Sequence, residues 1–225
     1  MLKEITKSFS QGVMLILTPG ENQLTFLGTG FLCSGKGYVL TCAHILNLTK
    51  PVFIATPPDP NSFPKLTENM FNAVPVTIAQ YDPLNDIALL KFDLRHISVS
   101  LPNPSFTMGD ERNSEIGSSV GYLGFPFGLQ TIKVSQSIIS AKTSTSHETR
   151  TLMLDSSVNN GNSGGPLIEL STGKIIGIVT GRFSPGGSAP VAWIGGSPLG
   201  QDSNISFATG ISHAIDLLKA EGIYE

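Results

Sequence analysis

The stretch NNGNSGGPLIEL, residues 159–170, gathers three glycines, one proline and a single serine in front of an apolar run. Glycine adopts backbone conformations that other residues avoid, so this composition predicts a sharply bent loop that leads into a strand. Two interpretations are open at this point. The segment is a plain loop between strands, or it is a bend that projects the Ser163 hydroxyl while neighbouring N–H groups point at one spot.

The composition is typical of a folded globular protein. The chain has 225 residues, of which 40% are hydrophobic and 14% charged, and its formal net charge is −3. We expect no nucleic-acid partner, because phosphate binding needs clustered Lys and Arg, and no membrane segment, because no apolar run is long enough. The N-terminal residues MLKEITKSFSQ lack the apolar core and cleavage site of a secretory signal. They predict a cytoplasmic protein, or a secreted or periplasmic one if a leader has been removed.

Short apolar or alternating runs, broken by Gly, Pro, Asn and Ser, recur along the whole chain. Strands that are this short and this evenly spaced are typical of β-sandwiches and β-barrels. The predicted strands are residues 12–18, 28–34, 37–43, 51–56, 74–82, 86–92, 118–125, 130–141, 150–156, 165–170, 173–180 and 204–211, with 189–195 as an additional strand or an ordered loop.

The strands fall into two sets separated by a segment rich in Pro, Asn and Ser. We therefore expect an N-terminal lobe at about 10–95, a linker at about 96–117 and a C-terminal lobe at about 118–211. A single helix is predicted at 212–222, with Ser212 as its N-cap and Gly222 as its stop.

The cysteines and the scattered histidines give no metal-binding pattern. Cys33 and Cys42 are not opposite one another in the hairpin predicted around residues 34–37, so we expect free thiols rather than a disulfide. His96, His147 and His213 lack metal-ligand spacing with cysteines or carboxylates. The prediction is a protein without a metal or cofactor.

Three segments that lie far apart in the sequence carry the residue types needed for acyl transfer. VLTCAHIL (39–46) ends a strand with His44, DPLNDIALLKF (82–92) begins one with Asp86, and GNSGGPL (161–167) contains Ser163. A serine needs an imidazole to accept its proton, the imidazole needs a carboxylate, and the oxyanion needs backbone donors. Alone, each residue has a simpler interpretation, as a buried histidine, a turn aspartate or a loop serine. Their joint occurrence favours a catalytic triad.

These blocks resemble the chymotrypsin-fold (trypsin-like) serine peptidases, and most closely the protease domain of the HtrA/DegP group. VGYLGFPFGLQ (120–130), SQSIISA (135–141) and ISFATGISHAIDLL (205–218) resemble further segments of that group. The resemblance covers nearly the whole chain. It implies one all-β peptidase domain over 1–225, in which two six-stranded antiparallel β-barrels pack face to face and a C-terminal helix follows.

The resemblance also implies a role for each site residue. It makes Ser163 the nucleophile, His44 the general base and Asp86 the partner that orients the imidazole. The oxyanion hole would comprise Gly161, Asn162 and Ser163, with the N–H groups of Gly161 and Ser163 as donors and Asn162 acting through the conformation of the loop.

Two departures from the wider family matter. Animal trypsin-like enzymes carry an aspartate before the serine that pairs with a new N-terminal amine, whereas Asn162 has no charge to pair, so we expect no activation of that type. HtrA proteins usually continue into a PDZ domain and commonly form trimers through an N-terminal extension. This chain ends at Glu225 and has about ten residues before its first predicted strand. The resemblance is therefore to the protease domain without its PDZ domain, and the oligomeric state stays open and includes a monomer.

The predicted specificity pocket is formed by Ser157, Val158 and the strand segment Thr180, Gly181 and Arg182. Ser157 stands six residues before Ser163, where a trypsin-like enzyme has an aspartate, so a preference for Lys or Arg has no counter-charge to support it. Val158 favours small or medium aliphatic side chains. An inward Arg182 would instead favour an acidic side chain, although a solvent-facing side chain is the expected pose.

The leading functional prediction is a serine endopeptidase that acts on peptides or unfolded proteins. One alternative is a protease-fold binding module with little turnover, and another is an esterase on the same triad. The first alternative has no support in the sequence, because no expected triad or oxyanion residue is replaced.

Overall fold

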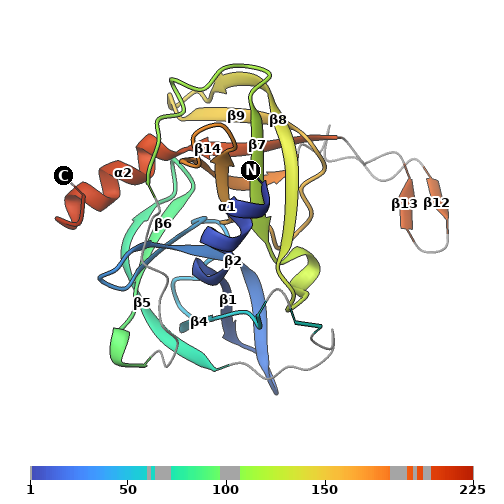
Figure 1. The fold of residues 1–225 in the computed structure, drawn as a ribbon. Coiled ribbons are helices and arrows are strands. Elements are labelled where there is room, and N and C mark those ends of the chain that lie inside the picture. Colours follow the sequence, from blue (N-terminus) through green and yellow to red (C-terminus); the bar gives the residue numbers. More distant parts are fainter. Residues whose placement is uncertain are drawn as a thin grey trace.

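The protein folds into two closed β-barrels, which lie one above the other in Figure 1. The computed structural model describes residues 2–59, 62–63, 72–96, 107–182, 192–194, 197–199 and 204–224. The first barrel has the strand order β1-β2-β3-β6-β5-β4, and each neighbouring pair is antiparallel. Its strands are β1 (Val13–Pro19), β2 (Leu24–Ser34), β3 (Tyr38–Thr41), β4 (Val52–Ala55), β5 (Ala73–Asp82) and β6 (Ile87–Lys91).

The second barrel repeats this plan with the order β10-β11-β14-β9-β8-β7. Its strands are β7 (Ser119–Gly124), β8 (Lys133–Ser144), β9 (Arg150–Asp155), β10 (Pro166–Glu169), β11 (Ile175–Arg182) and β14 (Ile205–Gly210). The remaining strands, β12 (Ala192–Ile194) and β13 (Ser197–Leu199), pair with each other outside the barrels. Strand β12 falls within the additional strand or ordered loop predicted at 189–195. The predicted class of two six-stranded antiparallel barrels with a C-terminal helix is confirmed.

Two hydrophobic clusters hold the barrels together. One fills the first barrel and continues across the seam to side chains of the second, including Leu123 and Phe125. The other fills the interior of the second barrel, with Tyr122, Leu154 and Val179 among its members. Because the first cluster is shared by both barrels, its burial favours a fixed arrangement of the two lobes.

The predicted C-terminal helix is confirmed as α2 (Ile211–Ala220), which contacts strands β6, β11 and β14 and so touches both barrels. Its predicted N-cap is wrong. Ser212 lies inside the helix, and its hydroxyl donates to the buried Glu111 carboxylate, which was too distant in sequence to be anticipated. At the other end, the Glu221 carboxylate accepts hydrogen bonds from Tyr38 Oη at 3.2 Å and Gln80 Nε2 at 2.7 Å.

A further helix, α1 (Leu2–Phe9), was not predicted. It buries Ile5 and Phe9, and the Leu2 side chain lies over Gly121 of β7. Three short 3₁₀ turns, η1 (Ser10–Gly12), η2 (Leu94–His96) and η3 (Pro126–Gly128), complete the helical elements of the described residues. In this part of the chain, no helix has the length and apolar character needed to cross a membrane.

A buried ionic network ties the segment before the second barrel to the start of α2. Glu111 accepts hydrogen bonds from Arg150 Nε at 2.6 Å and from the Ser212 N–H at 3.1 Å. Burial opposes ionisation of Glu111, but the hydrogen bonds from Ser212 and Arg150 outweigh it, and the pKa of the carboxyl is lowered. His213 joins the network, because its Nε2 accepts the Arg150 N–H at 3.0 Å.

This geometry requires a neutral His213 in the folded protein. Burial first, and the Arg150 charge second, lower the pKa of His213 below its ordinary value of 6.5. The unfolded chain therefore takes up a proton at higher pH than the folded one, and stability falls as the pH drops below about 6.5. Between pH 7 and 5 we expect Tm of the wild type to fall more steeply than Tm of His213→Gln, as measured by circular dichroism. His147→Gln, at an exposed site, should keep the wild-type slope; equal slopes for all three proteins would contradict this account.

Candidate active site

The end of β3 and the start of β6 bring His44 and Asp86 together. These strands pair through Thr41 and Ala88, so the residues just beyond that pair lie at the same end of the barrel. One Asp86 carboxylate oxygen accepts the His44 backbone N–H at 2.8 Å, and the other lies 2.7 Å from His44 Nδ1. Asp86 thus fixes both the main chain and the ring of His44. The imidazole is still accessible, because half of its side-chain surface (50%) is exposed.

The turn that carries Asp86 is held in place by its own hydrogen bonds. Asp86 has a φ of 57°, a left-handed conformation that aspartate tolerates better than most residues. Asp82 accepts the N–H groups of Leu84 and Asn85, both at 3.1 Å. The Asn85 side chain accepts the Thr149 hydroxyl at 2.7 Å, which links this turn to the second barrel.

Cys42 lies directly behind the His44–Asp86 pair. Its side chain is fully buried (0% exposed), and its Sγ donates to the Val179 carbonyl at 3.3 Å. Burial and the nearby Asp86 charge raise the pKa of this thiol well above its ordinary value. One ligand atom from each of Cys42, His44 and Asp86 lies within 4.8 Å of the others, the one such grouping found in the described residues. Cys33 and Cys42 are both free thiols.

The loop before β10 presents Ser163 at the seam. Gly161 has a φ of 98° and Gly164 a φ of 89°, and a Cβ at either position would collide with a carbonyl oxygen, of Phe125 or Thr29 respectively. Only glycine fits this bend. The Ser163 hydroxyl donates to the Thr180 carbonyl at 2.7 Å, and no hydrogen bond of the described residues joins it to His44. Thr180 itself sits at an irregularity in the β11–β14 register, between the pairs Val179–Ala208 and Gly181–Phe207.

The loop leaves two backbone donors available. The N–H groups of Asn162, Gly164 and Gly165 donate to carbonyls at 3.1, 2.8 and 3.0 Å. Those of Gly161 and Ser163 have no acceptor among the hydrogen bonds of the described residues. These are the two donors that the sequence pattern singled out for an oxyanion.

Thr29 connects this loop to the first barrel, a role that was not predicted from the sequence. Its N–H donates to the Ser163 carbonyl at 2.9 Å, and its hydroxyl donates to the Gly161 carbonyl at 2.6 Å. The same hydroxyl accepts the Phe125 N–H at 3.1 Å. Thr29 is fully buried and so holds the loop on both sides of Asn162. The only local signal is its place between Gly28 and Gly30, which gives no indication of such a role.

Asn162 is buried, with 1% of its surface exposed, and neither polar atom of its amide has a partner among the described residues. Its side-chain oxygen packs against Gly124. A buried amide without partners is costly, and a charged group at the same position would be costlier because it loses more hydration.

The predicted specificity residues have different surroundings. Ser157 is half-buried, and Val158 is packed in the core of the second barrel. Ser206, which the sequence analysis missed, bridges this segment by donating to the Ser156 carbonyl at 2.6 Å and accepting the Val158 N–H at 2.9 Å. The Arg182 side chain lies outside the described residues.

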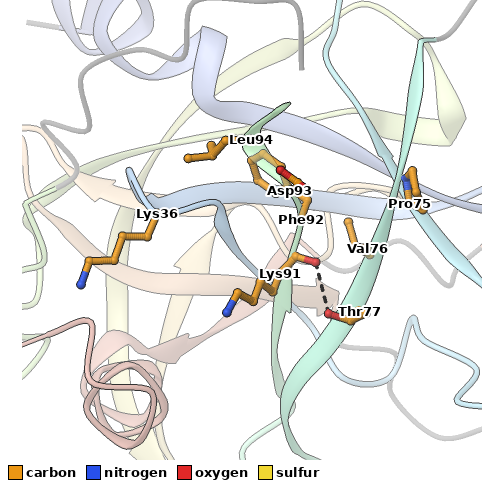
Figure 2. A pocket seen from close by; sticks show the side chains of 8 residues that line it. All are labelled: Lys36, Pro75, Val76, Thr77, Lys91, Phe92, Asp93 and Leu94. Atoms are coloured by element: carbon orange, nitrogen blue, oxygen red, sulfur yellow. Dashed lines mark hydrogen bonds between the residues drawn. The ribbon is translucent and has the colours of Figure 1, made fainter. Parts of the chain in front are cut away.

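A cavity of about 330 Å³ lies between the two barrels beside the proposed site. Asp86 and Thr180 both line it, together with Leu84, Asn85, Thr143, Ser144, Thr145, Thr149, Thr151, Phe207 and Thr209. A larger cavity, of about 570 Å³, opens on the first barrel between β5, β6 and the turn before β3 (Figure 2). None of the predicted site residues lines this second cavity.

Residues 28–178 match the trypsin-like peptidase domain family. A relative from Halomonas elongata, named a probable periplasmic serine endoprotease DegP-like, is 32% identical over 196 residues, which are 83% of this chain and 37% of the relative. The magnetosome formation protease MamE of Paramagnetospirillum magneticum is 29% identical over 182 residues, 79% of this chain and 23% of that protein. The chain thus spans well under half the length of these relatives.

Solved structures agree on the fold. The HtrA-type protease AlgW with tripeptide superposes with a TM-score of 0.73 at 23% identity, covering 98% of this chain and 63% of that one. The serine endoprotease from Yersinia pestis superposes with a TM-score of 0.68 at 24% identity, covering 99% of this chain and 66% of that one.

The relatives correct the predicted location. The expectation of a cytoplasmic protein is wrong, because the DegP-like relatives are named as periplasmic endoproteases. The expectation rested on the first eleven residues, most of which form α1 in the fold. The family match, the barrel topology and the His44–Asp86 geometry agree, and the chain belongs to the trypsin-like peptidase family, with an HtrA/DegP-type protease domain.

Proposed function

We propose that this chain is a serine endopeptidase in which Ser163 is the nucleophile, His44 the general base and Asp86 its orienting partner. The observation that carries the proposal is that Asp86 makes two hydrogen bonds with His44, one at the backbone N–H and one at Nδ1. A carboxylate at Nδ1 holds the ring proton there, so Nε2 is free to act as the base. The same carboxylate stabilises the imidazolium that forms when Nε2 takes the serine proton.

The reaction begins with a movement of the Ser163 side chain. Its hydroxyl rests on the Thr180 carbonyl and must rotate toward His44 before it attacks. The N–H groups of Gly161 and Ser163, which have no acceptor among the described residues, then stabilise the tetrahedral oxyanion. His44 returns its proton to the leaving amine. In the second half-reaction His44 takes a proton from water, the water oxygen attacks the acyl carbon, and the proton passes to the Ser163 oxygen as the carboxylic acid product departs.

The edge of β11 supplies a binding surface for an extended substrate. β11 pairs with β10 only as far as Ile178, so the backbone of Thr180 to Arg182 has one edge outside the β10–β11 ladder. A substrate strand added at this edge would donate an N–H to the Thr180 carbonyl and displace the serine hydroxyl from it. Substrate binding would thereby free Ser163 for His44.

The preferred substrate side chain before the cut is small or medium and aliphatic. The half-buried Ser157 provides no charge for Lys or Arg. Ser206 holds this segment in place through the Ser156 carbonyl and the Val158 N–H. The substrates are peptides or unfolded proteins in the periplasm or outside the cell, in keeping with the names of the DegP-like relatives and with the tripeptide bound to AlgW.

A fluorophosphonate probe tests the nucleophile directly. The wild type should be labelled at Ser163 and Ser163→Ala should not, while Ser171→Ala, at an exposed turn, should label like the wild type.

Asp86→Asn should slow casein cleavage by roughly three to four orders of magnitude, because the imidazole then takes the wrong tautomer. Mass-spectrometric profiling of cleaved peptides reads the aliphatic preference. Labelling without cleavage of any peptide, but with ester hydrolysis, would make the protein an esterase; no labelling would leave a binding module.

Thr29 is expected to position the oxyanion loop. Thr29→Val keeps the shape of the side chain but leaves the Gly161 carbonyl and the Phe125 N–H without their partner. We expect the free energy of unfolding to fall by about 1–3 kcal/mol and the probe to label Ser163 more slowly at full folding. Thr29→Ser retains the hydroxyl and serves as the control. A valine variant with wild-type labelling and stability would show that the hydroxyl is dispensable.

We expect the loop to tolerate a neutral side chain at position 162 but not a charged one. Asn162→Asp places a carboxylate at a buried site where no cationic partner is found in the described residues, and at pH 7 we expect the free energy of unfolding to fall by at least about 2 kcal/mol. Probe labelling should fall with it. Asn160→Asp, two residues earlier at an exposed site, is the matched control. Chemical denaturation compares the two variants, and an equal effect at both sites would be evidence against a special environment at 162.

A further inference from the structure

The geometry points to a second use of the proposed active site: a reversible inhibitory site for a thiophilic divalent cation such as Zn²⁺, formed by Cys42, His44 and Asp86. One sulfur, one nitrogen and one oxygen ligand atom from these residues lie within 4.8 Å of one another. Thiolate, imidazole and carboxylate are the three ligand types that zinc takes in proteins. The inhibitory consequence rests on the proposed roles of His44 and Asp86, whereas binding of the ion does not.

The three ligand atoms need only small movements to meet one ion. Tetrahedral zinc, with bonds of about 2.0–2.3 Å, places its ligands roughly 3.3–3.6 Å apart. His44 Nδ1 and the Asp86 oxygen are 2.7 Å apart, so they must separate by less than about 1 Å. Cys42 Sγ lies within 4.8 Å of both, so it must approach by at most roughly 1.2 Å. Sγ gives up only a weak hydrogen bond to the Val179 carbonyl in doing so.

The ion can enter from the solvent side. Cys42 is fully buried, but half of the His44 side chain is exposed, and Asp86 lines the cavity between the barrels. Three protein ligands leave a fourth position open for water on that side. Cys33, the other free thiol, belongs to no such group of ligands in the described part of the chain.

Binding at Nδ1 would stop the proposed chemistry. The imidazole nitrogen that now faces Asp86 would coordinate the ion, so the ring proton would reside on Nε2. A protonated Nε2 cannot accept the serine proton, and the carboxylate would be bound to the ion as well. The Cys42 thiol loses its proton on coordination, so one proton is released to solvent for each ion bound.

The inhibition experiment uses the intact chain and the fluorophosphonate probe. Zn²⁺ should slow labelling of the wild type and of Cys33→Ser, and EDTA should restore it; Ca²⁺ and Mg²⁺, which prefer oxygen ligands, should have no effect. Cys42→Ser keeps a hydrogen-bond donor near Val179 but loses the sulfur. With each protein normalised to its own metal-free rate, this variant should need at least about tenfold more Zn²⁺ for the same inhibition. Equal sensitivity of Cys42→Ser and Cys33→Ser would overturn the proposal.

A binding measurement separates this proposal from the proposed function. Co²⁺ added to Ser163→Ala, which cannot react with the probe, should give a thiolate-to-cobalt charge-transfer band at one ion per chain. The band should be absent from Ser163→Ala/Cys42→Ser, whose folding circular dichroism verifies. If the wild type is never labelled but the band appears, the metal site stands and the peptidase proposal fails. If labelling occurs but no band forms, the metal site is wrong.

Discussion

The buried Thr29 ties the loop that carries Ser163 to the barrel that carries the rest of the proposed catalytic apparatus. The imidazole and the carboxylate come from the first barrel, whereas the serine and the unpaired N–H groups come from the second. Thr29, in the first barrel, binds the carbonyls on both sides of Asn162. Each barrel closes its own hydrogen-bond ladders, so nothing in either ladder determines how the serine loop meets His44. The main-chain and hydroxyl bonds of Thr29 supply that constraint, and the shared hydrophobic cluster protects them from water.

Asp86 shows how one side chain can serve several demands at once. Its left-handed backbone, set by the hydrogen-bonded turn from Asp82, aims both carboxylate oxygens at His44. The same position brings it near the Cys42 sulfur, where burial and the Asp86 charge raise the pKa of the thiol. A group placed to orient an imidazole is therefore also placed to share an ion with it. The catalytic pair and the proposed metal site differ here by ligand movements of only about 1 Å.

The sequence predicted the features that depend on local periodicity or on joint occurrence of residue types. Alternating apolar runs identified every barrel strand, and the spacing of three polar blocks identified His44, Asp86 and Ser163 as candidates. Helix α1 was missed because it is short, although Leu2, Ile5 and Phe9 recur at helical spacing. Thr29 and Ser206 could not be found, because their partners lie 132 and 50 residues away in the chain. Ser212 looked like a cap until the fold placed Glu111 beside it.

The hydrogen bonds of the serine loop suggest why the proposed active site would be inactive before a substrate binds. The Ser163 hydroxyl donates to Thr180 and is not held by the base, so His44 has no proton to take until that bond is exchanged. The exchange needs a donor that can compete for the Thr180 carbonyl, and the N–H of an added substrate strand is such a donor. Folded proteins rarely present an unpaired strand of this kind, because exposed strand edges are usually covered or blocked. Under the proposed function, a preference for extended or unfolded substrates would therefore follow from the backbone geometry at Thr180. It would not require the enzyme to recognise a particular substrate side chain.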